Sequence, residues 1–97
     1  MSVEVKFIGP LINLTNCQSV DVQLNHLPQP TILSVIQHLS KKFGKSFEDR
    51  ILDYDTDKPR LRVLILKNDV EIHALKGLET PLNPGDKIVI IPVSHGG

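Results

Sequence analysis

The 97-residue sequence has few aromatic residues and almost no cysteine: three phenylalanines, one tyrosine, no tryptophan and a single cysteine, Cys17. One cysteine cannot form an internal disulfide, which excludes the disulfide-stapled class of small secreted domains. So few aromatic side chains offer no platform on which nucleic-acid bases could stack. The 11 basic and 11 acidic residues cancel, so no excess positive charge is available to displace counterions from a polyanion. We therefore expect no direct nucleic-acid partner.

Long apolar runs are also missing. No stretch approaches the roughly 18 apolar residues that a membrane-spanning helix needs. Residues 1–6 do not show the charged-then-apolar pattern of a secretory signal. We therefore expect a cytoplasmic protein without a membrane partner. The length is that of one domain with one modest core, which leaves little chain for a deep catalytic cleft.

The sequence shows no constellation of residues typical of an active site or a metal site. The four histidines lack the spacing of zinc ligands, and no glycine-rich nucleotide-binding motif occurs. Cys17 has no local base that would activate it as a nucleophile. Residues 53–57 begin like a calcium loop, but Lys58 and Leu64 occupy the positions where such a loop needs glycine and glutamate. We expect no enzyme, no bound cofactor and no metal.

Hydrophobic periodicity predicts a small α+β domain. Apolar and polar residues alternate over 3–8 and 20–24, which predicts two strands joined by a long connection over 9–19. Apolar residues recur at helical spacing over 32–43, with Thr31 as the N-cap. The positions predicted on the solvent side of this helix are Ser34, Gln37, His38 and Lys41.

The second half of the sequence adds strands and turns. Its predicted elements are a helical turn near 47–52, a β-rich run over 61–66, a turn at 67–69, a short strand at 70–72, a turn at 83–86 and a strand over 87–93. The order β-β-α-β-β indicates a mixed sheet of four or five strands with one main helix packed across it.

The last predicted strand is apolar on both faces. If Ile88 and Ile90 point to the core, then the side chains between and after them point to the opposite, open face. That face would carry Val89, Ile91, Val93, Leu64 and Leu66. Because an apolar patch on an open sheet face usually marks a binding surface, we predict that these residues dock a protein partner.

The sequence ends in Ser94, His95, Gly96 and Gly97, directly after this strand. Without Cβ atoms, two glycines can lie extended in a narrow channel of another protein. The terminal carboxylate would then be the reactive group, with ATP supplying a leaving group by adenylation. We therefore predict a domain over residues 1–93 and a flexible, reactive tail over 94–97.

Together these features resemble the β-grasp, ubiquitin-like sulfur carriers and modifiers: MoaD, ThiS, the archaeal small modifier proteins and the ubiquitin-related modifier. The resemblance spans nearly the whole chain and is strongest over 78–97, where Asn83-Pro84-Gly85-Asp86 precedes an aliphatic strand and the terminal glycines. It implies a β-grasp fold with the first and last strands adjacent and parallel. It also implies that Gly97 forms the thiocarboxylate or isopeptide bond, while Gly96, His95 and Ser94 thread into the partner.

The partners implied by the resemblance are an adenylating enzyme that consumes ATP, a sulfur donor, and either a sulfur acceptor enzyme or lysine-bearing targets; the carrier itself is expected to be a monomer. His95-Gly96-Gly97 is similar to the ending of the ubiquitin-related modifier, which favours tRNA thiolation or lysine conjugation. Ile91-Pro92-Val93 resembles the ending of MoaD, so a small subunit of molybdopterin synthase stays an alternative, as does thiamin synthesis. A β-grasp binding module with an inert tail is a further alternative.

Overall fold

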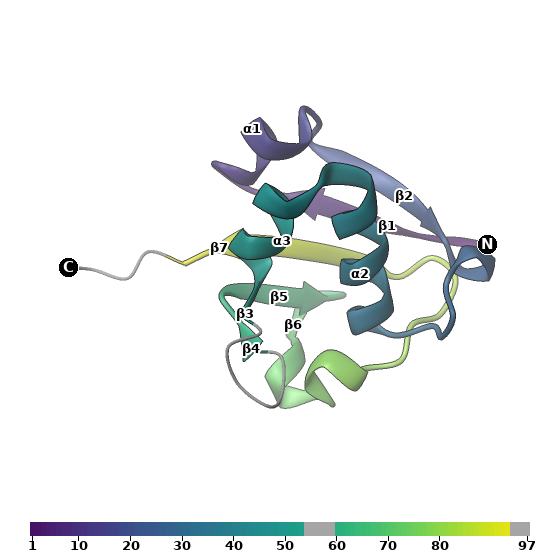
Figure 1. Cartoon of the computed structure of the whole chain (residues 1–97). Coiled ribbons are helices and arrows are strands. Elements are labelled where there is room, and N and C mark those ends of the chain that lie inside the picture. Colours follow the sequence, from purple (N-terminus) through teal and green to yellow (C-terminus); the bar gives the residue numbers. More distant parts are fainter. Residues whose placement is uncertain (54–59, 94–97) are drawn as a thin grey trace.

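The computed structural model describes residues 1–53 and 60–93. Its centre is a five-stranded mixed sheet with the strand order β2-β1-β7-β5-β6 (Figure 1). The strands of this sheet are β1 (Ser2–Phe7), β2 (Ser19–Gln23), β5 (Val63–Lys67), β6 (Val70–Glu71) and β7 (Lys87–Pro92). β1 and β7 are parallel neighbours in the middle of the sheet, and each pairs antiparallel with its other neighbour. The predicted mixed sheet and its central parallel pair are confirmed.

Helices cover one face of this sheet (Figure 1). They are α1 (Leu11–Thr15), α2 (Ile32–Phe43) and α3 (Lys45–Ile51), accompanied by the 3₁₀ turns η1 (Leu24–His26), η2 (Ile72–Ala74) and η3 (Gly77–Glu79). A two-stranded ladder of β3 (Leu52–Asp53) and β4 (Arg60–Leu61) lies beside the main sheet. Among the described residues, no helix combines the length and apolar character needed to cross a bilayer.

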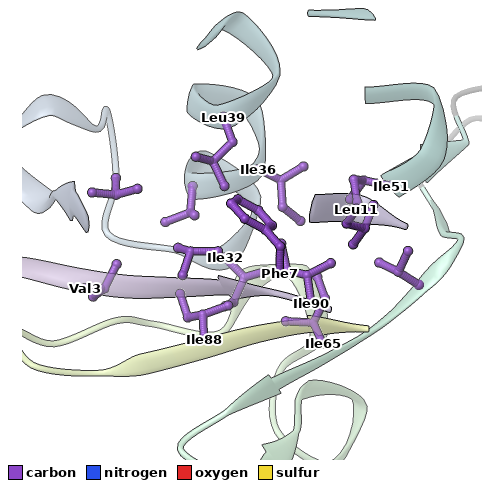
Figure 2. Packing of buried hydrophobic residues seen from close by; sticks show 14 of the residues in the cluster. Val3, Phe7, Leu11, Ile32, Ile36, Leu39, Ile51, Ile65, Ile88 and Ile90 are labelled. Atoms are coloured by element: carbon purple, nitrogen blue, oxygen red, sulfur yellow. The ribbon is translucent and has the colours of Figure 1, made fainter. Parts of the chain in front are cut away.

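The core lies between the sheet and the helices. The inward positions of β1, β5 and β7 pack against one face of α2, and Figure 2 shows the ring of Phe7 between the sheet and that helix. Phe7 meets the rings of Phe43 and Phe47 edge to face, with centroid separations of 5.8 and 5.9 Å. This geometry suits the quadrupoles of aromatic rings. Three phenylalanines therefore join β1, α2 and α3 into one cluster.

Helix α2 begins and ends as its sequence predicts. The Thr31 hydroxyl accepts a hydrogen bond of 3.3 Å from the backbone N–H of Ser34, which satisfies one of the free donors of the first turn. Gly44 follows the helix with a φ of 95°, a conformation that side chains disfavour. The prediction that Ser34 faces solvent is wrong, because its side chain is buried beside the Thr31 hydroxyl at 3.3 Å.

Two segments differ from the pattern expected from sequence. The predicted connection over 9–19 contains helix α1, whose buried Leu11 anchors it to the core. The predicted run over 61–66 is divided at Arg62, where the chain leaves β4 and enters β5. Helix α1 has only five residues, which are too few to show a clear helical period. The alternation of apolar and polar residues looks the same in one strand as in two short strands, so it did not reveal the break between β4 and β5.

A polar cluster fixes the two turns that flank β7. The Asp86 carboxylate accepts hydrogen bonds from the Asn83 backbone N–H (2.8 Å) and the Asn68 side-chain amide (2.9 Å). The Lys67 ammonium lies 3.6 Å from the same carboxylate. The Asn68 amide oxygen in turn accepts a 2.9 Å hydrogen bond from the Lys87 backbone N–H. This cluster ties the start of β7 to the β5–β6 hairpin and thereby sets the register of β7.

We predict that Asp86→Asn destabilises the protein by about 1–3 kcal/mol at pH 7. Burial alone would raise the pKa of Asp86, but the hydrogen bonds from Asn83 and Asn68 and the charge of Lys67 outweigh it and lower the pKa. A lowered folded-state pKa stabilises the fold above the unfolded value of about 3.9, and this contribution is lost as pH falls through the folded-state pKa. Urea unfolding from pH 7 to pH 3 should therefore show the two proteins converging. A gap that stays constant over this range would contradict the assignment.

Candidate functional site

The end of β7 is the point from which the predicted tail departs. Because β7 is parallel to β1, the C-terminal end of β7 and the N-terminus of the chain lie at opposite ends of the central strands (Figure 1). Pro92, the last residue of β7, has no backbone N–H to donate, which suits the end of a strand. The predicted tail residues Ser94, His95, Gly96 and Gly97 lie outside the described residues. The described structure thus fixes the residues immediately before the tail.

The side chains of β7 and β5 divide between the two faces of the sheet as predicted. Those pointing to the helices are buried, and Figure 2 shows three of them in the core: Ile65, Ile88 and Ile90. Leu64 is paired with Ile91, and Leu66 with Val89, so these four side chains share the open face. All four are half-buried and stay outside the core cluster. We call Leu64, Leu66, Val89 and Ile91 the apolar patch.

Charged residues border the apolar patch. Lys6 on β1 is in register with Val89, and Glu71 on β6 is in register with Leu66, so both share the open face. One oxygen of the Glu71 carboxylate accepts a hydrogen bond from the backbone N–H of His73, and the other lies 2.7 Å from the Nδ1 atom of His73. The backbone hydrogen bond from His73 is the main reason that the pKa of Glu71 is lowered. The patch is therefore an apolar centre with a cation on one side and a carboxylate on the other.

A hollow lies beside the end of β7. Its apolar lining comes from Leu11, Val63, Pro92 and Val93, and its volume is about 210 Å³. Asp49, Arg50 and Arg62 complete the lining. Val93, which was predicted to belong to the docking surface, is 43% exposed and lines this hollow. We call these seven residues the tail-exit hollow.

The other candidate residues do not assemble into a chemical site. Among residues 1–53 and 60–93, no three histidine, cysteine or acidic side chains are close enough to hold a metal ion. Cys17 is a free, half-buried thiol whose backbone N–H is hydrogen-bonded to the Thr15 hydroxyl at 3.4 Å. Asp53 pairs with Arg60 and Arg62, at 3.8 and 3.7 Å, while most of the calcium-like segment 53–57 lies outside the described residues.

Sequence reasoning missed the neighbours that the fold brings to the apolar patch and the tail. Lys6 could have been placed on the open face by the alternation in β1, but its register with β7 is a tertiary feature. Arg50 and Leu11 lie beside the end of β7 only because α3 and α1 pack there, and no local signal in the sequence indicates it.

Comparison with known proteins identifies the family. The ThiS family model matches residues 5–97, whereas no curated protein matches. The small archaeal modifier protein 1 (SAMP1) from Methanosarcina acetivorans is 27% identical, with a TM-score of 0.79 over 99% of this chain and 96% of that chain. CysO from Mycobacterium tuberculosis is 26% identical, with a TM-score of 0.76 over 95% of this chain and 99% of that chain.

Urm1 from Trypanosoma brucei is 24% identical, with a TM-score of 0.76 over 99% of this chain and 95% of that chain, and supports the fold alone. These matches confirm the β-grasp, ubiquitin-like fold that the resemblance implied. The family match extends from β1 to the terminal glycines. The chain therefore belongs to the ThiS family, and it is a ubiquitin-like protein of the sulfur-carrier and modifier type.

Proposed function

We propose that this chain is a sulfur carrier and protein modifier whose Gly97 carboxylate is activated by an ATP-dependent adenylating enzyme. The observation that carries the proposal is the apolar patch on β5 and β7, in a member of the ThiS family whose sequence continues from β7 to a Gly-Gly ending. The chain supplies the carboxylate and the docking surface, and its partners supply the catalysis.

The proposed chemistry starts at the terminal carboxylate. A Gly97 carboxylate oxygen attacks the α-phosphorus of ATP, and pyrophosphate leaves, which gives an acyl adenylate. Hydrosulfide released by a sulfur donor then attacks the acyl carbon and displaces AMP, and loss of the S–H proton leaves a thiocarboxylate. That sulfur serves tRNA thiolation through an acceptor enzyme. Alternatively, a lysine amine attacks the activated acyl group and forms an isopeptide bond.

For this role the last two residues of the tail must have no side chains. Gly96 and Gly97 can lie extended in a narrow channel, with His95 and Ser94 leading into it. The apolar patch and Val93 dock the enzyme and hold the channel mouth at the end of β7. Binding energy from the folded domain thereby positions the reactive Gly97 carboxylate.

A second candidate is the small subunit of molybdopterin synthase, which the Ile91-Pro92 ending favours. In that role the same tail would insert into a larger MoaE-like subunit. The two candidates differ in their stable partner. Size-exclusion chromatography with a MoaE-like protein from the same source should show a stable complex only for the second candidate, whereas lysine adducts on other proteins would support the first.

The experiment that tests activation is exchange of labelled pyrophosphate into ATP, with the adenylating enzyme from the same source. We expect the full chain to support exchange and deletion of Gly97 to reduce it by at least about 100-fold, because the carboxylate no longer reaches the α-phosphate. The folded domain precedes this residue, so circular dichroism of the two proteins should coincide. Equal exchange for both would overturn the proposal and favour a binding module with an inert tail.

A further inference from the structure

The tail-exit hollow lies on the helix side of the sheet, away from the apolar patch. Its lining includes Leu11 and Val63, which are core residues, together with Pro92 and Val93 at the start of the tail. An engineered apolar cavity of about 150 Å³ holds a benzene molecule. A hollow of about 210 Å³ therefore admits one large aliphatic side chain from outside.

Among the described residues, the lining of the hollow carries more positive than negative charge: Arg50 and Arg62 against Asp49. Its one carboxylate, Asp49, pairs with Lys45 at 3.3 Å. Arg62 shares Asp53 with Arg60, so two guanidinium groups face one carboxylate. Within the part of the chain that the structure describes, Arg50 forms no ion pair. A ligand that complements this rim would place an acidic group beside Arg50.

We propose that the tail-exit hollow is a second docking point for the adenylating enzyme, and that it takes an aliphatic side chain followed by a carboxylate on that enzyme. This inference rests on the proposed function. An enzyme that holds the tail in a channel has its channel mouth against the end of β7. That end presents Ile91 on the open face and Pro92 and Val93 on the hollow, so the mouth contacts both surfaces.

The charge of Arg50 makes the inference testable without disturbing the fold. Arg50 is exposed on α3, so its replacement leaves the core intact. In pyrophosphate exchange at low salt, Arg50→Glu should raise the KM for the carrier about tenfold with kcat unchanged, because the lost ion pair acts on association. Arg50→Lys should restore most of the wild-type KM, and the defect should shrink at high salt.

Lys76→Glu is the matched control. Lys76 is exposed between η2 and η3, it forms no ion pair within the described residues, and the substitution makes the same change of charge. We expect its KM to stay within about twofold of wild type. If Arg50→Glu and Lys76→Glu raise KM equally while the wild type is activated, the hollow is not a docking point although the proposed function stands. If the wild type itself supports no exchange with an active enzyme, the proposed function fails first.

Discussion

Ile91→Asp is expected to abolish activation while the protein stays folded. Ile91 is half-buried on the open face, paired with Leu64 and outside the core cluster, so the carboxylate can stay hydrated in the free protein. In the complex with the adenylating enzyme the same carboxylate would be desolvated without a partner in an apolar interface. A penalty of about 3–5 kcal/mol corresponds to a loss of roughly 150- to 5000-fold in kcat/KM for the carrier.

The measurement is pyrophosphate exchange at several carrier concentrations, with thermal unfolding monitored in parallel. Val70→Asp is the matched control, because Val70 is 43% exposed on β6 and lies outside the apolar patch. It should keep kcat/KM within about threefold of wild type, as a solvated surface change does. Folded Ile91→Asp with wild-type kcat/KM would show that the open face does not dock the enzyme.

Ile90→Asp, one residue earlier, is expected to unfold the protein. Ile90 has no exposed surface and lies in the core with Ile88 and Ile65 (Figure 2). Removing a buried aliphatic side chain costs about 2–5 kcal/mol, and burying an unpaired carboxylate adds several more. The total approaches the 5–15 kcal/mol by which a domain is stable.

Circular dichroism and urea unfolding compare Ile90→Asp with Ile90→Val. Valine keeps the branched apolar shape and should cost only about 0.5–1.5 kcal/mol, which leaves a cooperative transition. The aspartate variant should show no such transition at 25 °C. If Ile90→Asp folded with near-native stability while Ile91→Asp unfolded, the two faces of β7 would be reversed.

The faces of the strands could be predicted from sequence because alternation has a period of two. Val3, Val5 and Phe7 alternate with polar residues, and this pattern settles which side of β1 is buried. In β7 both faces are apolar, so the assignment of Ile88 and Ile90 to the core depended on the fold, and the structure confirms it. Thr31 and Gly44 marked the ends of α2 because capping is local chemistry.

The features that sequence did not reveal depend on contacts between distant segments. Asp86 meets Asn68 and Lys67 only because two turns 18 residues apart converge beside β7. Ser34 is buried although it is polar, because its hydroxyl finds a partner in the capping Thr31. The tail-exit hollow forms only where α1, α3 and β7 meet. In the sequence alone, Arg50 cannot be distinguished from the other charged surface residues. Such convergence is a property of the assembled fold.

The most direct test of the sulfur-carrier function is the intact mass of the chain after incubation with ATP, the adenylating enzyme and a sulfur donor from the same source. If Gly97 carries the sulfur, the mass increases by the replacement of one oxygen by sulfur. The increase should be absent when Gly97 is deleted, and in Ile91→Asp only a small fraction of the chains should show it. An unchanged mass of the folded wild-type chain, with an enzyme shown to activate another carrier, would contradict a sulfur-bearing role for Gly97.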